Sequence, residues 1–524
     1  MASSMSAPRD GSTSSSSLSP LALSPRSDHT LTGFVPVQTP DVNATETPTQ
    51  TYELHVDPHQ FDRATHIKPL SLARPHMRTF HVSWLTAIMG FLGWYAIPPL
   101  MPVIKDQLGL SKGDVLNSDI ASTASTILSR IAVGPLLELY GPQVVHSLTL
   151  WLGAIPIVCA AFVSSASTLI LVRFFIGLVG CIFVSSQFWT TITFAKNVVG
   201  TSNAISGGLG LSGIGWAFLV LPLVNAGLAS AMSVDLAWRL TIALPAVVMV
   251  AMGSIAWYRA DGCPMGPYHH LRLAQRERQG APVAAADDSV GARAVLSRLV
   301  QSFGVVLRDW NTHILVLHYA VCFGAELQLN NMGALYFFEE FDAATCETPT
   351  TADGRCPALS KQHAALLAST FGLMNMWARA LGGLSSDFAN RRWGMRGRLV
   401  VQFVLLCLQG GLIIALSRAT SLGASIALYI VVAVAAQSAG GSTFGIVPYV
   451  NEAYTGTVTG LVGAGGNIGG VVFGIIFRAT ATRADGLFIM GCIVLASSVF
   501  AACVVIRRDD KHDASSSIAV QSAV

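Results

Sequence analysis

Apolar runs of roughly 18 to 25 residues, separated by short polar breaks, fill most of the chain from residue 80 to residue 506. A helix of that length crosses the hydrocarbon core of a bilayer, which is about 30 Å thick. The chain is 52% hydrophobic and only 12% charged, whereas soluble domains carry about twice that charge. The pattern therefore predicts an all-α membrane protein whose main solvent is lipid.

Hydropathy predicts twelve transmembrane helices in two sets of six. The first set is expected near residues 80–103, 117–139, 144–165, 168–194, 201–225 and 238–258, and the second near 311–338, 361–388, 398–417, 421–447, 456–478 and 485–506. The first six helices form an N-terminal half over residues 80–258, and the second six form a C-terminal half over residues 310–506.

Three polar regions lie outside these halves. Residues 1–75 are rich in Ser, Thr and Pro and are expected to be a disordered tail, residues 259–309 are a linker, and residues 507–524 are a second tail. Arginines gather in the linker and in the loop near residues 391–398, which predicts that both termini are cytoplasmic. The acidic loop after residue 338 is then external, so we expect its Cys346 and Cys356 to form a disulfide.

Several function classes are not expected. The formal charge of +3 gathers in a few loops and does not predict a nucleic-acid partner. The other cysteines lie mostly singly in apolar runs, without accompanying histidines, so neither a metal nor a cofactor is expected. No nucleophile and base pair within the apolar runs indicates an enzyme.

An internal repeat relates the two halves. The stretch from Arg130 to Glu138 and the stretch from Arg379 to Asp387 both read R-x3-G-x3-acid, at an offset of 249 residues. Gly180-Cys-Ile-Phe183 likewise parallels Gly441-Ser-Thr-Phe444, and the glycines from Gly210 parallel those from Gly466. Two six-helix halves repeated in parallel are typical of the major facilitator fold.

The two arginines of the repeat are the strongest functional candidates. An arginine in mid-membrane costs about 2.5 to 3.5 kcal/mol, and Arg130 and Arg379 lie at matching mid-helix positions. Both are expected to face a central cavity, where two flat guanidinium groups would suit a small planar oxyanion. Glu138 and Asp387, at the ends of the two motifs, are the candidate gating residues.

The stretch Gly463-Ala-Gly-Gly-Asn-Ile-Gly-Gly470 resembles the helix 11 signature of the nitrate/nitrite porter family. The likeness extends to Phe80-His-Val-Ser-Trp84, to Phe183-Val-Ser-Ser-Gln-Phe-Trp189 and to Gly394-Met-Arg-Gly-Arg398, over about residues 80 to 480, and is closest to the eukaryotic high-affinity nitrate transporters. It implies uptake of nitrate, and of nitrite as well, by proton symport with alternating access. The plasma membrane is the expected location.

The resemblance also implies roles for single residues. Arg130 and Arg379 would clamp the anion, and Phe183 and Tyr319 would line its site. Gly466 and Gly469 belong to the helix 11 signature, and Asn467, polar within that glycine run, is a further candidate substrate-binding residue that could orient an arginine or the anion. Leu211 departs from the family, because asparagine is expected at that repeat counterpart of Asn467. The loop after Glu138 also lacks the usual basic residue, so gating there is expected to rest on Glu138 alone.

The residues leave the energy source open. Glu326 and His318 are the intramembrane candidates for carrying protons, although Glu326 could instead be a structural ion-pair partner. A nitrite-preferring porter or a nitrate/nitrite exchanger would need no proton site, and a non-transporting anion sensor is a further alternative. Some relatives also work with a small accessory membrane protein, which makes such a partner possible here.

Overall fold

The computed structural model describes residues 52–278, 292–342, 356–359 and 361–506. The expectations for residues 1–51, for the tail 507–524 and for Cys346 lie outside this range. Cys356 is disulfide-bonded, but because Cys346 is not described, the pairing of these two cysteines stays a prediction.

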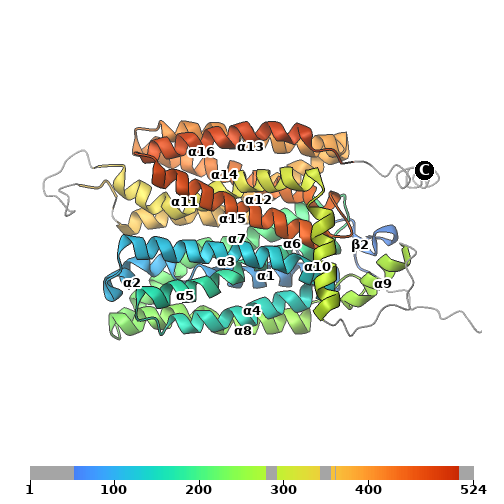
Figure 1. The fold of residues 1–524 in the computed structure, drawn as a ribbon, viewed down its shortest axis with the longest axis horizontal. Helices are drawn as coiled ribbons and strands as arrows, with labels where there is room; N and C mark the ends of the chain where they lie inside the picture. The colour runs from blue at the N-terminus through green and yellow to red at the C-terminus, as the bar shows by residue number, and fades with distance from the viewer. Residues whose placement is uncertain (1–51, 279–291, 343–355, 360, 507–524) are drawn as a thin grey trace, which may run out of the picture. The chain divides into compact units, whose positions relative to one another are not determined.

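Long helices account for nearly all of the described chain, and all twelve expected helices are present (Figure 1). The first half consists of α1 (His76–Trp94), α3 (Lys112–Tyr140), α4 (Pro142–Ala160), α5 (Ala166–Gly177) with α6 (Ile182–Thr193), α7 (Val199–Ala229) and α8 (Val234–Arg259). The second consists of α11 (Trp310–Glu339), α12 (Lys361–Trp393), α13 (Met395–Ser417), α14 (Leu422–Ile446), α15 (Thr455–Ala479) and α16 (Arg483–Ser497). A short helix, α2 (Met101–Leu108), follows α1.

Polar residues at the breaks fix where several of these helices begin. Ser111 accepts a hydrogen bond from Asp114 N and the Asp114 carboxylate accepts one from Ser111 N, which forms a capping box at the start of α3. Ser233 and Ser421 accept from backbone N–H groups in the first turns of α8 and α14. The polar breaks seen in the sequence are therefore the helix caps.

The expected single helix over residues 168–194 contains an irregular turn. A 3₁₀ segment, η3 (Leu178–Cys181), joins α5 to α6. There Thr126 Oγ1 donates to Gly177 O at 2.6 Å, and a Cβ at Gly180 would lie 2.5 Å from the Thr126 side chain. Glycine is needed for this approach, and the irregular turn leaves the Gly180 carbonyl free to accept a side-chain hydrogen bond.

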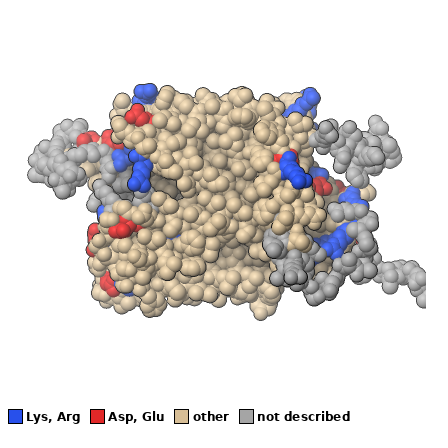
Figure 2. Space-filling model, in the orientation of Figure 1, with Lys and Arg blue, Asp and Glu red and all other residues tan. Residues whose placement is uncertain are grey.

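Ten helical segments in the described chain are long and apolar enough to cross a membrane. The helices α11 and α12 are also long, with 30 and 33 residues, but they are more polar because they carry Glu326, Asn375 and Arg379, which other helices cover. Figure 2 shows an uncharged surface between two ends where charged residues gather. This distribution is the one expected of a bundle surrounded by lipid.

Two pairs of helices connect the halves closely. At the α3–α15 contact, a Cβ on Gly134 would lie 2.5 Å from the Gly456 carbonyl oxygen, and at the α7–α12 contact a Cβ on Gly215 would lie 2.6 Å from Leu373 N. Small residues therefore let the backbones of opposite halves touch.

One end of the bundle carries additional elements, and we call it the linker face. Helices α9 (Tyr268–Arg278) and α10 (Ala292–Val306) of the linker lie there, and α10 reaches both α3 and α15 (Figure 1). The expectation of a disordered tail through residue 75 is wrong for residues 52–75. Strands β1 (Val56–Asp57) and β2 (Arg63–Ala64) pair as an antiparallel hairpin, because their residues find main-chain and apolar partners on the N-terminal half.

Candidate functional site

Arg130 lies on α3 with 0% of its surface exposed. Its Nε donates to Gly180 O at 3.0 Å and its Nη1 donates to Gly463 O at 2.8 Å. When the Asn467 amide is oriented so that its oxygen faces the guanidinium, as the surrounding donors require, that oxygen accepts from Nη1 at 3.0 Å and from Nε at 3.3 Å. Arg130 Nη2 has no hydrogen-bond partner among the described residues, so this buried cation has neutral partners and one free donor group.

Arg379 lies on α12 and is equally buried, but its partners differ. Its Nη2 forms an ion pair with Glu326 Oε2 at 3.0 Å, and both side chains are 1% exposed. Asn375, one turn earlier on α12, donates to Glu326 Oε1 at 2.7 Å and accepts from Arg379 Nε at 3.3 Å. Tyr319 Oη accepts from Arg379 Nη1 at 3.4 Å. This arginine therefore has a carboxylate to balance its charge.

The two arginines share one aromatic wall. Phe183 lies 5.3 Å from Arg130 Cζ and 5.8 Å from Arg379 Cζ, measured to the ring centroid. Phe323 lies at 5.4 and 5.8 Å from the same two atoms. Cation–π attraction acts over such distances, so both guanidinium groups are held beside the same pair of rings. The repeat thus brings its two arginines to one place.

Tyr319 and Phe444 complete this wall, which then consists of four aromatic residues. Phe183 and Tyr319 are nearly parallel with ring centroids 6.0 Å apart, Tyr319 stacks on Phe323 at 5.0 Å, and Phe444 meets both Phe183 and Tyr319 edge-on at 4.9 Å. All four side chains are buried. A flat anion held among them would be shielded from water.

The helix 11 signature brings α15 close to this site. A Cβ on Gly466 would lie 2.6 Å from Phe323 Cδ1, and a Cβ on Gly469 would lie 1.9 Å from the Ala320 carbonyl oxygen. Any larger residue would push α15 away from α11. These glycines therefore set the distance between Asn467 and the aromatic wall.

The departure at Leu211 has a structural counterpart. Leu211 is fully buried on α7, one turn beyond Gly208, whose Cβ position would lie 3.0 Å from Arg379 Cβ. Arg130 of the first half has Asn467 of the second half as an amide partner, whereas Leu211, the residue that the repeat matches to Asn467, is apolar. Arg379 instead receives its polar contacts from Glu326 and Asn375. The site is therefore asymmetric.

The two candidate proton carriers lie in different settings. Glu326 contacts Arg379 directly. His318 is buried next to Tyr319 in sequence, but both of its ring nitrogens lack a hydrogen-bond partner within the described residues. Of these two candidates, only Glu326 has a contact with an arginine among the described residues. No group of His, Cys, Asp and Glu in the described ranges could hold a metal ion.

At the linker face, the side chains of both acidic residues of the repeat bond to the backbone of the opposite half. Glu138 Oε1 accepts from Thr457 N at 2.7 Å in the first turn of α15, and Asp387 Oδ2 accepts from Thr201 N at 2.5 Å in the first turn of α7. A carboxylate at a helix N-terminus satisfies free N–H groups and interacts favourably with the helix dipole. Each half therefore caps a helix of the other, which joins the two halves at this face.

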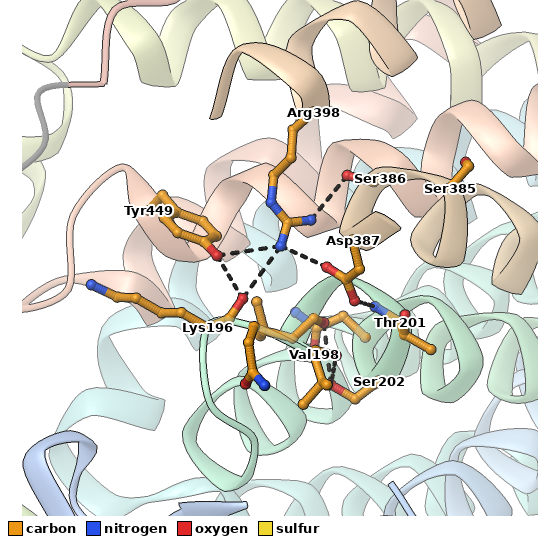
Figure 3. Close-up of polar contacts among 12 residues, drawn as sticks. Lys196, Val198, Thr201, Ser202, Ser385, Ser386, Asp387, Arg398 and Tyr449 are labelled. Carbon is orange, nitrogen blue, oxygen red and sulfur yellow. Dashed lines mark hydrogen bonds and ion pairs between the residues drawn. The ribbon is translucent and has the colours of Figure 1, made fainter. Parts of the chain in front are cut away.

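The cap at Asp387 is reinforced by a buried arginine (Figure 3). Arg398 Nη2 lies 2.6 Å from Asp387 Oδ1, and its Nη1 donates to Ser386 Oγ at 3.0 Å. The same Nη2 donates to Tyr449 Oη at 3.2 Å and to the Lys196 carbonyl at 3.3 Å. Arg398, on α13, therefore joins α12 and the 3₁₀ segment after α14, η5 (Val447–Tyr449), to the loop before α7 of the other half.

The cap at Glu138 includes a residue of the linker, and the expectation that gating rests on Glu138 alone stays a prediction. Ser302 on α10 donates to Glu138 Oε2 at 3.4 Å and also contacts the Thr457 hydroxyl. A hydroxyl from the linker thus contacts the Glu138 carboxylate. Only the folded chain brings it there, because Ser302 is 164 residues away in the sequence.

Sequence reasoning missed several of these residues, although signals for some were present. Phe444 is the repeat counterpart of Phe183, at the same offset as Gly441 and Gly180. Phe323 and Asn375 each lie one helical turn from a predicted site residue, Tyr319 or Arg379, and so share its helix face.

Comparisons with known proteins agree with this geometry. Residues 83–474 match the Major Facilitator Superfamily. The chain is 35% identical to the high affinity nitrate transporter 2.5 of Arabidopsis thaliana, over 84% of this chain and 81% of that protein. It is 32% identical to nitrate transporter 2.1 of Chlamydomonas reinhardtii, over 80% and 73%.

More distant matches follow the same pattern. The nitrate/nitrite transporter NrtP of Picosynechococcus is 26% identical over 76% of this chain and 84% of that protein. The structure of the proton:xylose symporter XylE has a TM-score of 0.58 at 14% identity and covers 82% of this chain and 96% of its own, which shows the fold alone. The chain is therefore a transporter of the Major Facilitator Superfamily and belongs to the family of the high-affinity nitrate transporters.

Proposed function

We propose that this protein imports nitrate, and nitrite as well, and that the anion binds between Arg130 and Arg379. The observation that carries this proposal is the meeting of two buried guanidinium groups on one aromatic wall, with Arg130 Nη2 left as a free donor. A planar oxyanion could accept hydrogen bonds from both forks while its faces contact Phe183 and Tyr319. The substrates named for the relatives support the same choice.

The anion would also drive the conformational change. Arg130 has no carboxylate partner among the described residues, so an anion between it and Arg379 would supply the missing negative charge and draw the halves together. The caps at Glu138 and Asp387 hold the linker face closed in this structure. Opening that face and closing the other would release the anion by alternating access.

Glu326 is our proposed proton carrier. The anion and the Glu326 carboxylate would compete for Arg379, because both are oxyanions that need the same N–H donors. Once the anion takes Arg379, an ionised Glu326 would remain buried without a cation, which is costly. Proton binding at Glu326 would therefore accompany anion binding. His318 has no comparable contact, so we assign it no direct role.

Symport also fits the energetics of uptake. Moving a monovalent anion into a negative cell costs about 2.3 kcal/mol per 100 mV. One proton moved with the anion would cancel this cost, and a second would let the voltage assist uptake. An exchanger would instead need an outgoing anion for each one that enters.

We further propose that the linker face is cytoplasmic and that the protein lies in the plasma membrane. The arginine-rich linker and the arginines near residues 391–396 support this orientation. We assign residues 80–258 and 310–506 to the two transporting halves. Whether a small accessory membrane protein assists, as in some relatives, is best tested by comparing uptake by the purified chain with uptake in cells.

The test is uptake by the purified protein in proteoliposomes, with nitrate, nitrite and chloride compared and with the pH gradient and voltage set independently. We expect uptake of nitrate and nitrite that rises with an inward proton gradient, and little uptake of chloride. Glu326→Gln should abolish proton-driven net uptake but retain nitrate/nitrite exchange. Wild-type uptake that needs internal nitrite and ignores the proton gradient would identify an exchanger. Nitrate binding without movement would indicate a sensor.

A further inference from the structure

The hairpin segment, residues 52–65, is a packed part of the protein. Its Leu54 and Ala64 side chains are 3% and 0% exposed and join a small apolar cluster with Phe80 of α1 and Phe194, just after α6. The hairpin therefore has its own buried contacts with the N-terminal half, at the linker face.

The hairpin segment holds the loop between α6 and α7, residues 194–198, which we call the gate loop. Three consecutive gate-loop residues donate hydrogen bonds to it: Ala195 N to Ala64 O at 2.9 Å, Lys196 N to Gln60 Oε1 at 3.0 Å, and Asn197 Nδ2 to Thr65 O at 2.8 Å. A bridge between Ala64 and Phe194 continues the pairing. The position of the gate loop is thus fixed from the hairpin side.

The opposite side of the gate loop contacts the C-terminal half (Figure 3). The Lys196 carbonyl accepts from Tyr449 Oη at 2.5 Å and from Arg398 Nη2 at 3.3 Å. The Lys196 ammonium forms an ion pair with Glu452, in the segment before α15. Lys196 therefore bonds to the hairpin segment through its N–H, and to the C-terminal half through its carbonyl and its side chain.

Glu452 shows that the hairpin also acts electrostatically on the other half. Burial raises the pKa of the Glu452 carboxyl, but the hydrogen bond and charge of Lys196, together with the charges of Arg63 in β2 and Arg278 in α9, outweigh burial and hold the pKa below its usual range. The carboxylate is thus ionised among cations from the loop, the hairpin and the linker.

We propose that Gln60 and the main chain of the hairpin segment are positioning groups for the transport cycle, because they hold the Lys196 carbonyl where Arg398 and Tyr449 can bind it. The hairpin then stabilises the state closed at the linker face through the gate loop. Releasing it would shift the carrier towards the state open on that face. This inference uses the proposed nitrate transport only as its readout.

The first test is the double variant Gln60→Ala with Asn197→Ala in the full-length protein, with His55→Ala as the control. His55 is an exposed hairpin residue that packs on His66 and does not bond to the gate loop through its side chain. Nitrate affinity is measured from each side of oriented proteoliposomes. We expect the ratio of the two affinities to move about fivefold in favour of the linker face, and no change in His55→Ala. Equal loss on both sides, or no shift, would overturn the proposal.

A double-mutant cycle tests whether the hairpin acts through Lys196. Tyr449→Phe removes one donor to the Lys196 carbonyl, so it should produce a shift in the same direction. If both changes act on the gate loop, the combined variant should shift the ratio by less than the product of the separate shifts. Fully independent effects would mean that the hairpin stabilises the protein without positioning this carbonyl.

Hydrogen exchange gives a readout that does not require nitrate. The backbone amides of Ala195 and Lys196 should be protected in the wild type, and Lys196 should lose protection in Gln60→Ala. Protection in the transmembrane helices should remain, which separates loop release from unfolding. If the wild type does not transport nitrate but shows this pattern of hydrogen exchange, the transport proposal fails and the hairpin inference stands. Unchanged exchange at Lys196 would refute the inference alone.

Discussion

Glu326 and Arg379 form a buried ion pair in this transporter, whereas Arg130, the repeat counterpart of Arg379, has only neutral partners. The asymmetry means that the two arginines are not equivalent binding groups. Arg130 presents a free N–H group to an incoming anion, while Arg379 must first exchange its carboxylate partner.

Replacing either arginine by lysine should nearly abolish nitrate uptake while the protein still reaches the membrane. A lysine keeps the charge but cannot reproduce the planar fork, so affinity should fall by at least about tenfold. Uptake affinity and the amount of protein at the surface are measured together. Arg478→Lys, at an exposed arginine near the end of α15, is the matched control. Near-normal affinity in Arg130→Lys or Arg379→Lys would exclude the proposed clamp.

Asn467→Ala should weaken nitrate binding by about tenfold or more, because a hydrogen bond to a charged group contributes roughly 1.5 to 3 kcal/mol. The amide contacts Arg130 directly, so its loss would leave that guanidinium less firmly oriented. Leu211→Asn should strengthen binding or change the preference between nitrate and nitrite, since it restores an amide at the matching position of α7. If affinity is unchanged in both variants and only protein abundance falls, these positions serve helix packing.

The sequence was sufficient to predict the helices and the two arginines for a clear physical reason. Lipid requires long uninterrupted apolar helices, and an arginine inside such a helix is costly enough to mark a function. The repeat then indicated that Arg130 and Arg379 meet, which agrees with their shared contacts to Phe183 and Phe323.

Other features depend on contacts that leave no local pattern. The hairpin is held by main-chain hydrogen bonds to residues more than 130 positions away, as between Ala64 and Ala195, and such bonds carry no side-chain periodicity. Composition alone therefore made residues 52–75 resemble a disordered tail. Ser302 likewise looks like an ordinary linker serine until the fold places it beside Glu138.

Asp387→Asn should destabilise the protein more than Glu138→Gln. Both changes keep an oxygen that can accept from the capped N–H group, but the first leaves the buried Arg398 without its carboxylate partner. Breaking a buried ion pair on one side costs about 3 to 5 kcal/mol, so the apparent melting temperature in detergent should fall clearly. Adding Arg398→Gln should recover part of the loss. If the two single variants melt alike, Arg398 does not depend on Asp387 for its compensation.

Ser302→Ala should loosen the linker-face cap at Glu138, because Ser302 of the linker helix α10 bonds to Glu138 of α3 and to Thr457 of α15. The expected result is a shift of nitrate affinity towards the linker face by about fivefold, since a hydrogen bond to a carboxylate is lost. Gln301→Ala, at the exposed neighbouring position of α10, is the control and should behave as the wild type. Because Ser302 acts on the Glu138 cap, combining Ser302→Ala with Glu138→Gln should add little to the effect of Glu138→Gln alone. A shift of the same size in Gln301→Ala would instead assign the effect to the linker helix as a whole, and additive shifts in the double variant would show that Ser302 acts independently of the Glu138 cap.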